Sequence, residues 1–248
     1  MSSNGFYKVP IELCEHAIKN NLLREAQIWL TGVHLYYGKA KPNGGTYEQF
    51  ASACGVSKRT VMRTLNDLEQ LDWVYKNRSS NWLHFRGKKQ LRAISQWSYS
   101  RSALIFTEGL SRFKAFCIGA IVSNFIKRNK GAGTGCKSRR PVNPWHPVSL
   151  SIFQSLFDVS QKTAFNYRKL AVQEDFLKMR YDIREVADLY PNDLKRLKQN
   201  NIENLTVHCL GYAHPEKVNT KQLRTKRGKV VSQFPNLLLP NVIIKRDK

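Results

Sequence analysis

The sequence predicts a mainly helical fold with small β-hairpins, in the α+β class, and three observations lead to it. Residues 46–71 carry two short amphipathic helix patterns separated by a glycine. Residues 73–85 then carry two runs of aromatic and branched residues around a polar turn, a pattern typical of a strand hairpin. The same succession of patterns returns at an offset of 103 residues. We therefore expect two tandem copies of one small helical unit.

The first copy begins with Thr46, which together with Gln49 predicts a capping box at the start of a helix that ends near Cys54. Gly55 suits the tight turn that follows, because glycine takes a positive φ without a Cβ clash. Ser57 is then expected to cap a second helix.

This second helix has an apolar stripe and a polar face. Branched residues at helical spacing form the stripe, namely Val61, Leu65, Leu68 and Leu71. The positions left outward are Lys58, Arg59, Met62, Arg63 and Asn66. Three of these five are basic, so the face should attract a negatively charged ligand. The hairpin after the helix has a polar tip that carries Lys76 and Arg78.

The order A-x-x-x-G-V-S-x-x-T-V-x-R-x-L-x-x-L, from Ala51 to Leu68, resembles the winged helix-turn-helix families of bacterial regulators and of plasmid and phage replication initiators. The resemblance implies a winged helix that binds double-stranded DNA. The residues expected at the DNA in this copy are Ser57, Lys58, Arg59, Thr60, Met62, Arg63, Lys76 and Arg78. A structural or protein-binding winged helix is the alternative, and the basic outward face argues against it.

Composition points to the same class of partner. The chain of 248 residues has a formal net charge of +23 and a pI near 10.0, which indicates a polyanionic ligand. The charge is concentrated, because residues 73–157 contain fifteen Lys and Arg residues and only one acid, Glu108. A merely solvated basic surface usually mixes acids among its bases.

Neither a metal nor a cofactor is expected. The five cysteines form no C-x-x-C pair and are interpreted as reduced, mostly buried thiols: Cys14, Cys54, Cys117, Cys136 and Cys209. Pairing Cys136 with His146, or Cys209 with His208 and His214, matches no familiar zinc spacing. The most apolar run, residues 116–126, is too short to span a bilayer, and no signal peptide opens the chain. We expect a cytoplasmic, nucleoid-associated protein of a bacterial or phage-infected cell, with no membrane partner.

In chain order, we predict an N-terminal winged-helix domain over residues 1–86. Pro10 should begin its first helix, Asn20–Asn21 should interrupt the helices, and residues 22–36 should form a support helix. Residues 87–106 are interpreted as a basic, partly helical connector. Residues 107–248 form a C-terminal winged-helix-like domain whose first helix begins near Thr107.

The second copy spans Ser149–Tyr181 and departs from the first at two positions. Asp158 stands where Gly55 stood, and Asp tolerates positive φ better than most residues. Arg168 stands where Leu65 was expected to be buried. The candidate DNA-binding residues of this copy are Ser160, Gln161, Lys162, Asn166 and Lys169.

Residues 183–214 carry helical patterns around Val186 and residues 194–197, then a strand-like run from residue 204, and are expected to form an insertion within the second wing. Residues 217–229 hold six basic residues and no acid. They are interpreted as a long wing or arm that reaches a groove through Arg224, Lys226 and Arg227, with a disordered basic loop as the alternative. The apolar tail should pack back on the domain.

Two winged helices within about 250 basic residues resemble plasmid and phage replication initiators. The resemblance implies sequence-specific binding at repeated origin sites, with a second copy of the chain or the replication machinery as further partners. A transcriptional regulator of the same architecture is the alternative. A nicking enzyme is disfavoured, because the six histidines include no His-x-His pair, and a recombinase is disfavoured, because residues 208–212 are too little to supply its Arg, His and Tyr site. An ATP-driven helicase is disfavoured, because no phosphate-binding loop of the Walker type occurs.

Overall fold

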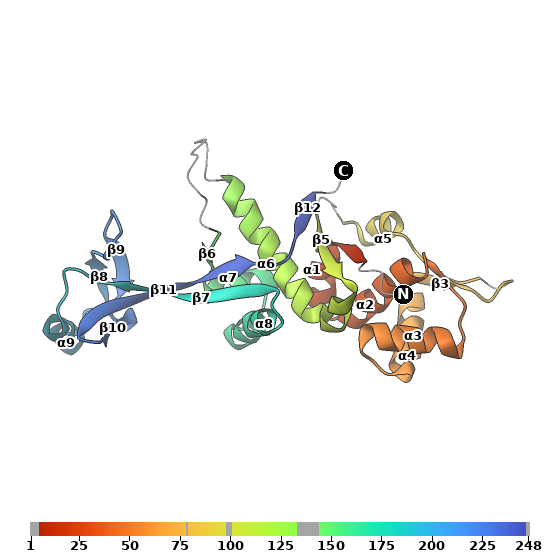
Figure 1. Ribbon diagram of the computed structural model, residues 1–248, viewed down its shortest axis with the longest axis horizontal. Helices are drawn as coiled ribbons and strands as arrows, with labels where there is room; N and C mark the ends of the chain where they lie inside the picture. Colours follow the sequence, from red (N-terminus) through yellow and green to blue (C-terminus); the bar gives the residue numbers. More distant parts are fainter. Residues whose placement is uncertain (1–4, 78, 98–100, 133–143, 247–248) are drawn as a thin grey trace. The chain divides into compact units, whose positions relative to one another are not determined.

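The computed structural model describes residues 5–77, 79–97, 101–132 and 144–246 (Figure 1). Helices and strands are both present, in agreement with the predicted α+β class. The contacts divide the chain into two compact units. Unit 1 comprises residues 1–141, 151–178 and 240–248, and unit 2 comprises residues 142–150 and 179–239.

Unit 1 begins with four helices that match the predicted order. They are α1 (Ile11–Lys19), α2 (Leu23–Leu35), α3 (Gly44–Cys54) and α4 (Lys58–Gln70). The expected break between α1 and α2 is confirmed, and Asn21 takes a positive φ of 57° there. The side chain of Trp29 on α2 is fully buried and meets Trp73 edge-on at 6.2 Å between ring centroids. The predicted support helix is therefore the centre of this core.

A small sheet follows α4 and contains the predicted hairpin, formed by β3 (Val74–Lys76) and β4 (Leu83–Phe85). A short strand, β2 (Lys39–Ala40), pairs with β4. A Cβ on Gly32 would lie only 2.3 Å from the ring of Phe85. The glycine thus lets α2 lie directly against β4.

The predicted connector is an integral part of unit 1. It contains α5 (Lys88–Ser95) and β5 (Arg101–Phe106), which is the central strand between β1 (Phe6–Pro10) and β12 (Ile244–Arg246). The helical part was expected and the strand was not, because its partners lie near the two ends of the chain. The C-terminal tail does pack back, through β12. The division at residues 86 and 106 stays a prediction.

A long apolar helix completes the core of unit 1. The short 3₁₀ helix η1 (Thr107–Arg112) leads into α6 (Phe113–Ala132), so the predicted start near Thr107 is confirmed. Residues 108–129 form a helical segment long and apolar enough to cross a membrane, but 78% of its apolar stretch is buried within the protein, as in a core helix. Helix α6 packs against α1 and against α8 (Gln161–Gln173). Helix α7 (Leu150–Phe157) comes before α8 in the sequence.

Unit 2 is built on the long strand β11 (Lys229–Pro240). This strand pairs with β6 (His146–Pro147), β7 (Leu177–Glu185) and β10 (Leu223–Lys226). Four further elements lie between β7 and β10 in the sequence: α9 (Pro191–Gln199), β8 (Asn204–Val207), β9 (Glu216–Asn219) and the 3₁₀ helix η2 (Thr220–Gln222). Residues 186–228 thus lie between two paired strands. The predicted insertion, residues 183–214, was shorter, and its first three residues belong to β7.

The insertion has a small apolar core, and one of its predicted helices is wrong. Val186 is not helical but bridges Cys209 and donates its backbone N–H to the carbonyl of Val230 at 2.9 Å. Its β-branched side chain is buried with Leu194, Val207 and others in this core. The helix around Leu194 and the strand at residue 204 are confirmed.

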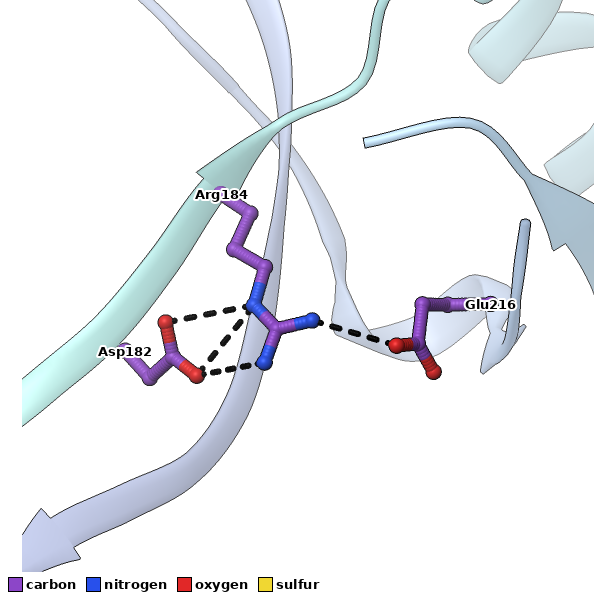
Figure 2. A network of polar contacts seen from close by, with 3 residues as sticks. All are labelled: Asp182, Arg184 and Glu216. Atoms are coloured by element: carbon purple, nitrogen blue, oxygen red, sulfur yellow. Dashed lines mark hydrogen bonds and ion pairs between the residues drawn. The ribbon is translucent and has the colours of Figure 1, made fainter. Parts of the chain in front are cut away.

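An ion-pair network joins β7 to the insertion (Figure 2). The guanidinium of Arg184 donates to Asp182 at 2.8 Å and to Glu216 at 3.3 Å, and Arg184 and Asp182 leave only 16% and 10% of their side chains exposed. The Arg184 Cζ atom also lies 3.8 Å from the ring centroid of Tyr212 and 3.9 Å from that of Phe234. Burial alone would lower the pKa of Arg184, but the hydrogen bond and charge of Asp182 raise it. The guanidinium therefore stays charged.

We predict that Arg184→Met destabilises unit 2 by about 3 kcal/mol or more, because it leaves the Asp182 carboxylate buried without its partner. Thermal unfolding and hydrogen exchange of β7, β8 and β9 measure this loss. The double variant Asp182→Asn, Arg184→Met removes the orphaned charge and should recover part of the stability. Equal stability of the single and double variants would contradict this explanation.

Candidate nucleic-acid interface

The candidate interface begins at α3, whose start differs from the prediction. Asn43 is the N-cap, and its Oδ1 accepts the backbone N–H of Thr46 at 2.9 Å. The predicted capping box of Thr46 and Gln49 is therefore wrong. Thr46 is buried inside the helix, and Gln49 instead accepts a hydrogen bond from the Tyr36 hydroxyl at 2.5 Å. Asn is a strong N-cap because its side-chain oxygen reaches the free N–H groups of the first turn.

The turn after α3 has the predicted left-handed geometry, with Gly55 at φ 64°. A buried amide fixes its position, because Gln27 Nε2 donates to the carbonyl of Cys54 at 2.9 Å and to that of Leu110 at 2.6 Å. Burial raises the pKa of the Cys54 thiol, which lies 3.2 Å from Thr31 Oγ1. The thiol is therefore a neutral packing group at this turn.

Helix α4 has the predicted cap and outward face. Ser57 Oγ accepts the backbone N–H of Thr60 at 3.1 Å. Val61, Leu65 and Leu68 are buried as predicted, whereas Leu71 is the C-cap and only half-buried. The five outward positions are all exposed: Lys58, Arg59, Met62, Arg63 and Asn66.

The cations on this face differ in their partners. Lys58 Nζ lies 3.1 Å from Glu48 Oε1 on α3. Among the described residues, the guanidiniums of Arg59 and Arg63 have no hydrogen-bond or ion-pair partner and stand one turn apart on the exposed face. Both are therefore available to base edges or phosphates.

The hairpin beside α4 is fixed at its base. Arg86 Nη2 pairs with Asp72 Oδ1 at 2.5 Å, and the Arg86 Cζ atom lies 5.4 Å from the ring centroid of Tyr75. Lys76 is exposed on β3 next to the tip. The predicted contact residue Arg78 lies outside the described residues. The described hairpin thus presents one of its two predicted cations.

The local geometry of α3 and α4 recurs at α7 and α8. Asp158 takes φ 52° at the turn, so its predicted positive φ is confirmed. Ser160 is the N-cap of α8 and accepts the N–H of Thr163 at 3.3 Å. At the other end, Phe176 N donates to Ala171 O at 3.0 Å, as Trp73 N donates to Leu68 O at 2.9 Å. The polar candidates of α8 are all exposed: Gln161, Lys162, Asn166 and Lys169.

One exposed residue of this face is absent from the predicted set. Phe165 exposes 48% of its surface between Lys162 and Asn166, and it stands at the position of Met62, which also exposes 48%. The offset of 103 residues was the signal that identifies it, because Met62 itself was among the predicted contacts.

The basic segment of unit 2 forms a hairpin and not a disordered loop. Strands β10 and β11 pair up to Lys226 opposite Lys229, and Arg227 and Gly228 form the two-residue turn with φ of 51° and 76°. Both values are positive, as in a type I′ turn, for which Asn-Gly is the favoured pair. Arg224, Lys226 and Arg227 are exposed, whereas Lys229 pairs with Glu185 at 2.9 Å. The tip thus presents an arginine in a backbone conformation that L residues disfavour.

Comparison with known families decides the nature of the first segment. A family model described as a helix-turn-helix domain matches residues 37–74. These residues form a helix-turn-helix domain. The domain includes α3, α4 and the turn at Gly55, and its presence suggests DNA as the partner. No curated protein and no solved structure matches the chain.

In the part of the chain that the structure describes, no group of three or more His, Cys, Asp or Glu side chains is positioned to hold a metal ion. Cys136, one of the considered ligands, lies outside that part. Burial, together with the charge of Lys88, lowers the pKa of His34 to about 4, so this histidine is neutral at pH 7. The chemistry of the described interface is therefore that of cations, amides and exposed apolar groups.

We predict that Arg59→Ala weakens binding to a specific DNA site by about 1 to 3 kcal/mol and relaxes the preference at one base position, because a bidentate contact to guanine is lost. Arg59→Lys is the matched control. It keeps the charge and the salt dependence but lacks the planar fork, so base preference should still fall. Binding assays on duplexes that vary one base pair at a time measure both effects. An unchanged preference in Arg59→Ala would remove this residue from the set that reads bases.

We predict that Arg227→Asn stabilises the β10–β11 hairpin by up to about 1 kcal/mol and weakens DNA binding. Asn adopts the left-handed conformation of this turn more easily than Arg, but it carries no charge. The log-log salt slope of DNA binding should fall by about 0.9, as expected for one lost phosphate contact. Urea unfolding and salt-dependent binding measure the two effects. Greater stability with unchanged DNA affinity would show that the tip does not touch DNA.

Proposed function

We propose that this protein binds double-stranded DNA sequence-specifically through two winged helix-turn-helix segments in tandem. In this proposal α4 and α8 are the recognition helices. The β3–β4 hairpin and the β7–β11 pair are the wings. The basic β10–β11 hairpin extends the second wing toward a groove. The helix-turn-helix domain at residues 37–74 supports the first half of the proposal.

The proposal that α8 is a second recognition helix rests on the agreement between the outward faces of α4 and α8. Each of the five exposed positions of α4 has an exposed counterpart on α8 at the same offset: Gln161, Lys162, Phe165, Asn166 and Lys169. Both helices have a serine N-cap that follows a left-handed turn. A face kept exposed with its amides and cations is suited to base edges, because Asn pairs with adenine and Arg or Lys with guanine.

For the biological role, we propose replication initiation at repeated origin sites of a plasmid or phage, in the cytoplasm. Two DNA-binding helix-turn-helix segments in one chain suit a long DNA site that contains repeated sequences. A transcriptional regulator of the same architecture is the second candidate. Selection of bound duplexes from random DNA, compared with the DNA flanking the gene, separates the two. Iterated repeats support an initiator, and a single promoter-overlapping palindrome supports a regulator.

We also propose that the protein acts without cutting DNA. The sequence has no His-x-His pair, which a rolling-circle nicking enzyme would need for its metal. Supercoiled plasmid incubated with the protein and Mg²⁺ or Mn²⁺ should stay intact. Accumulation of nicked circles at a defined position would overturn this part of the proposal.

The tandem arrangement predicts a footprint of about two helical turns of DNA per chain, because recognition helices on one face of a duplex enter major grooves about 10 to 10.5 base pairs apart. Arg59→Ala and Lys162→Ala should each erase protection over a different half of the footprint. Hydroxyl-radical footprinting on a selected site measures this directly.

Lys8→Ala is the matched control, because it removes one exposed charge from β1, a strand that pairs with β5 and belongs to neither proposed helix-turn-helix. It should leave both halves of the footprint protected. If Lys162→Ala left footprint and affinity unchanged while Arg59→Ala abolished both, the second segment would be better interpreted as a dimerisation or partner-binding module.

A further inference from the structure

Each proposed recognition helix presents one large apolar side chain on its outward face. Met62 on α4 and Phe165 on α8 each expose 48% of their surface, and they occupy the same position in the repeat. The other four outward positions of each helix are polar or basic. Single exposed apolar residues are common on protein surfaces.

Packing within the fold does not account for these two side chains. The buried positions of α4 are on its other face, with Val61 and Leu68 fully buried, and on α8 the buried positions are Ala164 and Ala171. On the next turn of the same helix, the Arg168 Cζ atom lies 5.6 Å from the centroid of the Phe165 ring. The ring therefore remains on the outward surface, with a cation beside it.

The chemistry of DNA restricts what these side chains can bind. The edges of the base pairs in the major groove carry hydrogen-bond donors and acceptors and a single apolar group, the C5 methyl of thymine. A methionine or phenylalanine side chain on a recognition helix can remove this methyl from water, and each buried methyl-sized group contributes about 0.8 kcal/mol. The neighbouring Asn166 suits adenine, so α8 carries groups for both bases of an A·T pair.

We propose that Met62 and Phe165 read thymine, each by contact with a C5 methyl group, one in each half of the DNA site. This inference rests on the proposed DNA binding and identifies a specificity determinant within it. The polar neighbours Arg63 and Asn166 would then read adjacent base edges, while the apolar side chain distinguishes thymine from cytosine in the same groove.

The test replaces the thymines of a selected duplex one at a time by deoxyuridine, which pairs as thymine does but lacks the methyl group. With the wild-type protein, one substitution in each half should weaken binding about fourfold, the equivalent of one methyl group. The substitution is made in the DNA, so this measurement does not depend on the folding of any variant. Unchanged affinity at every position, or a selected site without a preferred thymine in either half, would overturn the inference.

Variants assign each methyl group to its side chain. Phe165→Ala should abolish the sensitivity to deoxyuridine in one half only, and Met62→Ala in the other half only. Phe165→Leu keeps an apolar contact and should keep the sensitivity. If Phe165→Ala retained both sensitivities and instead changed the sedimentation of the protein, Phe165 would be a protein contact and the inference would be wrong. Failure to select any duplex at all would overturn the proposed DNA binding itself.

Discussion

The first recognition helix depends on one buried amide. Gln27 lies on α2 with only 4% of its surface exposed, and its Nε2 donates both to the last residue of α3 and to Leu110 in η1. A buried amide without partners would be strongly destabilising, so these hydrogen bonds fix where α3 ends relative to the support helix. The left-handed turn at Gly55 and the Ser57 cap then set the direction of α4. A loss of the Gln27 amide would therefore change the orientation of the proposed DNA-binding face of α4 without altering any residue on that face.

Turns, helix caps and exposed helix faces were predictable because interactions between residues close in the sequence determine them. The left-handed turns at Gly55 and Asp158, the serine caps and the exposed face of α4 all follow from residue type and helical spacing. The predicted start of α3 was wrong because two residues that make good N-caps, Asn43 and Thr46, lie three positions apart. Thr46 is buried within the helix, so Asn43 is the N-cap. Sheet partners were missed where they are distant in sequence. Strand β5 pairs with segments from both ends of the chain, and no spacing within residues 101–106 encodes that.

Unit 2 illustrates the difference between residues that maintain a structure and residues that are free to bind. Arg184 is enclosed by two carboxylates and two aromatic rings, which makes it unavailable to a ligand despite its charge. Arg227 has no such partner among the described residues and adopts a conformation that L residues disfavour. The sequence placed Arg227 in the basic segment 217–229, whereas Arg184 lay in the segment expected to be an insertion. Departures from local backbone preference usually persist where function requires the side chain, so the left-handed arginine at the hairpin tip is a candidate ligand contact.

The distribution of acids extends this distinction to the whole described chain. With 18 acidic residues against 41 basic ones, most cations must lack a carboxylate partner, so the positions that have one are informative. The paired cations either fix a hairpin base, as Arg86 does with Asp72, or join separate elements, as Arg112 does with Glu174. Among the described residues, the cations of the outward faces of α4 and α8, apart from Lys58, have no carboxylate within ion-pair distance. Apart from Lys58, the basic residues proposed to bind DNA on α4 and α8 are therefore different from those that pair with carboxylates in the described fold.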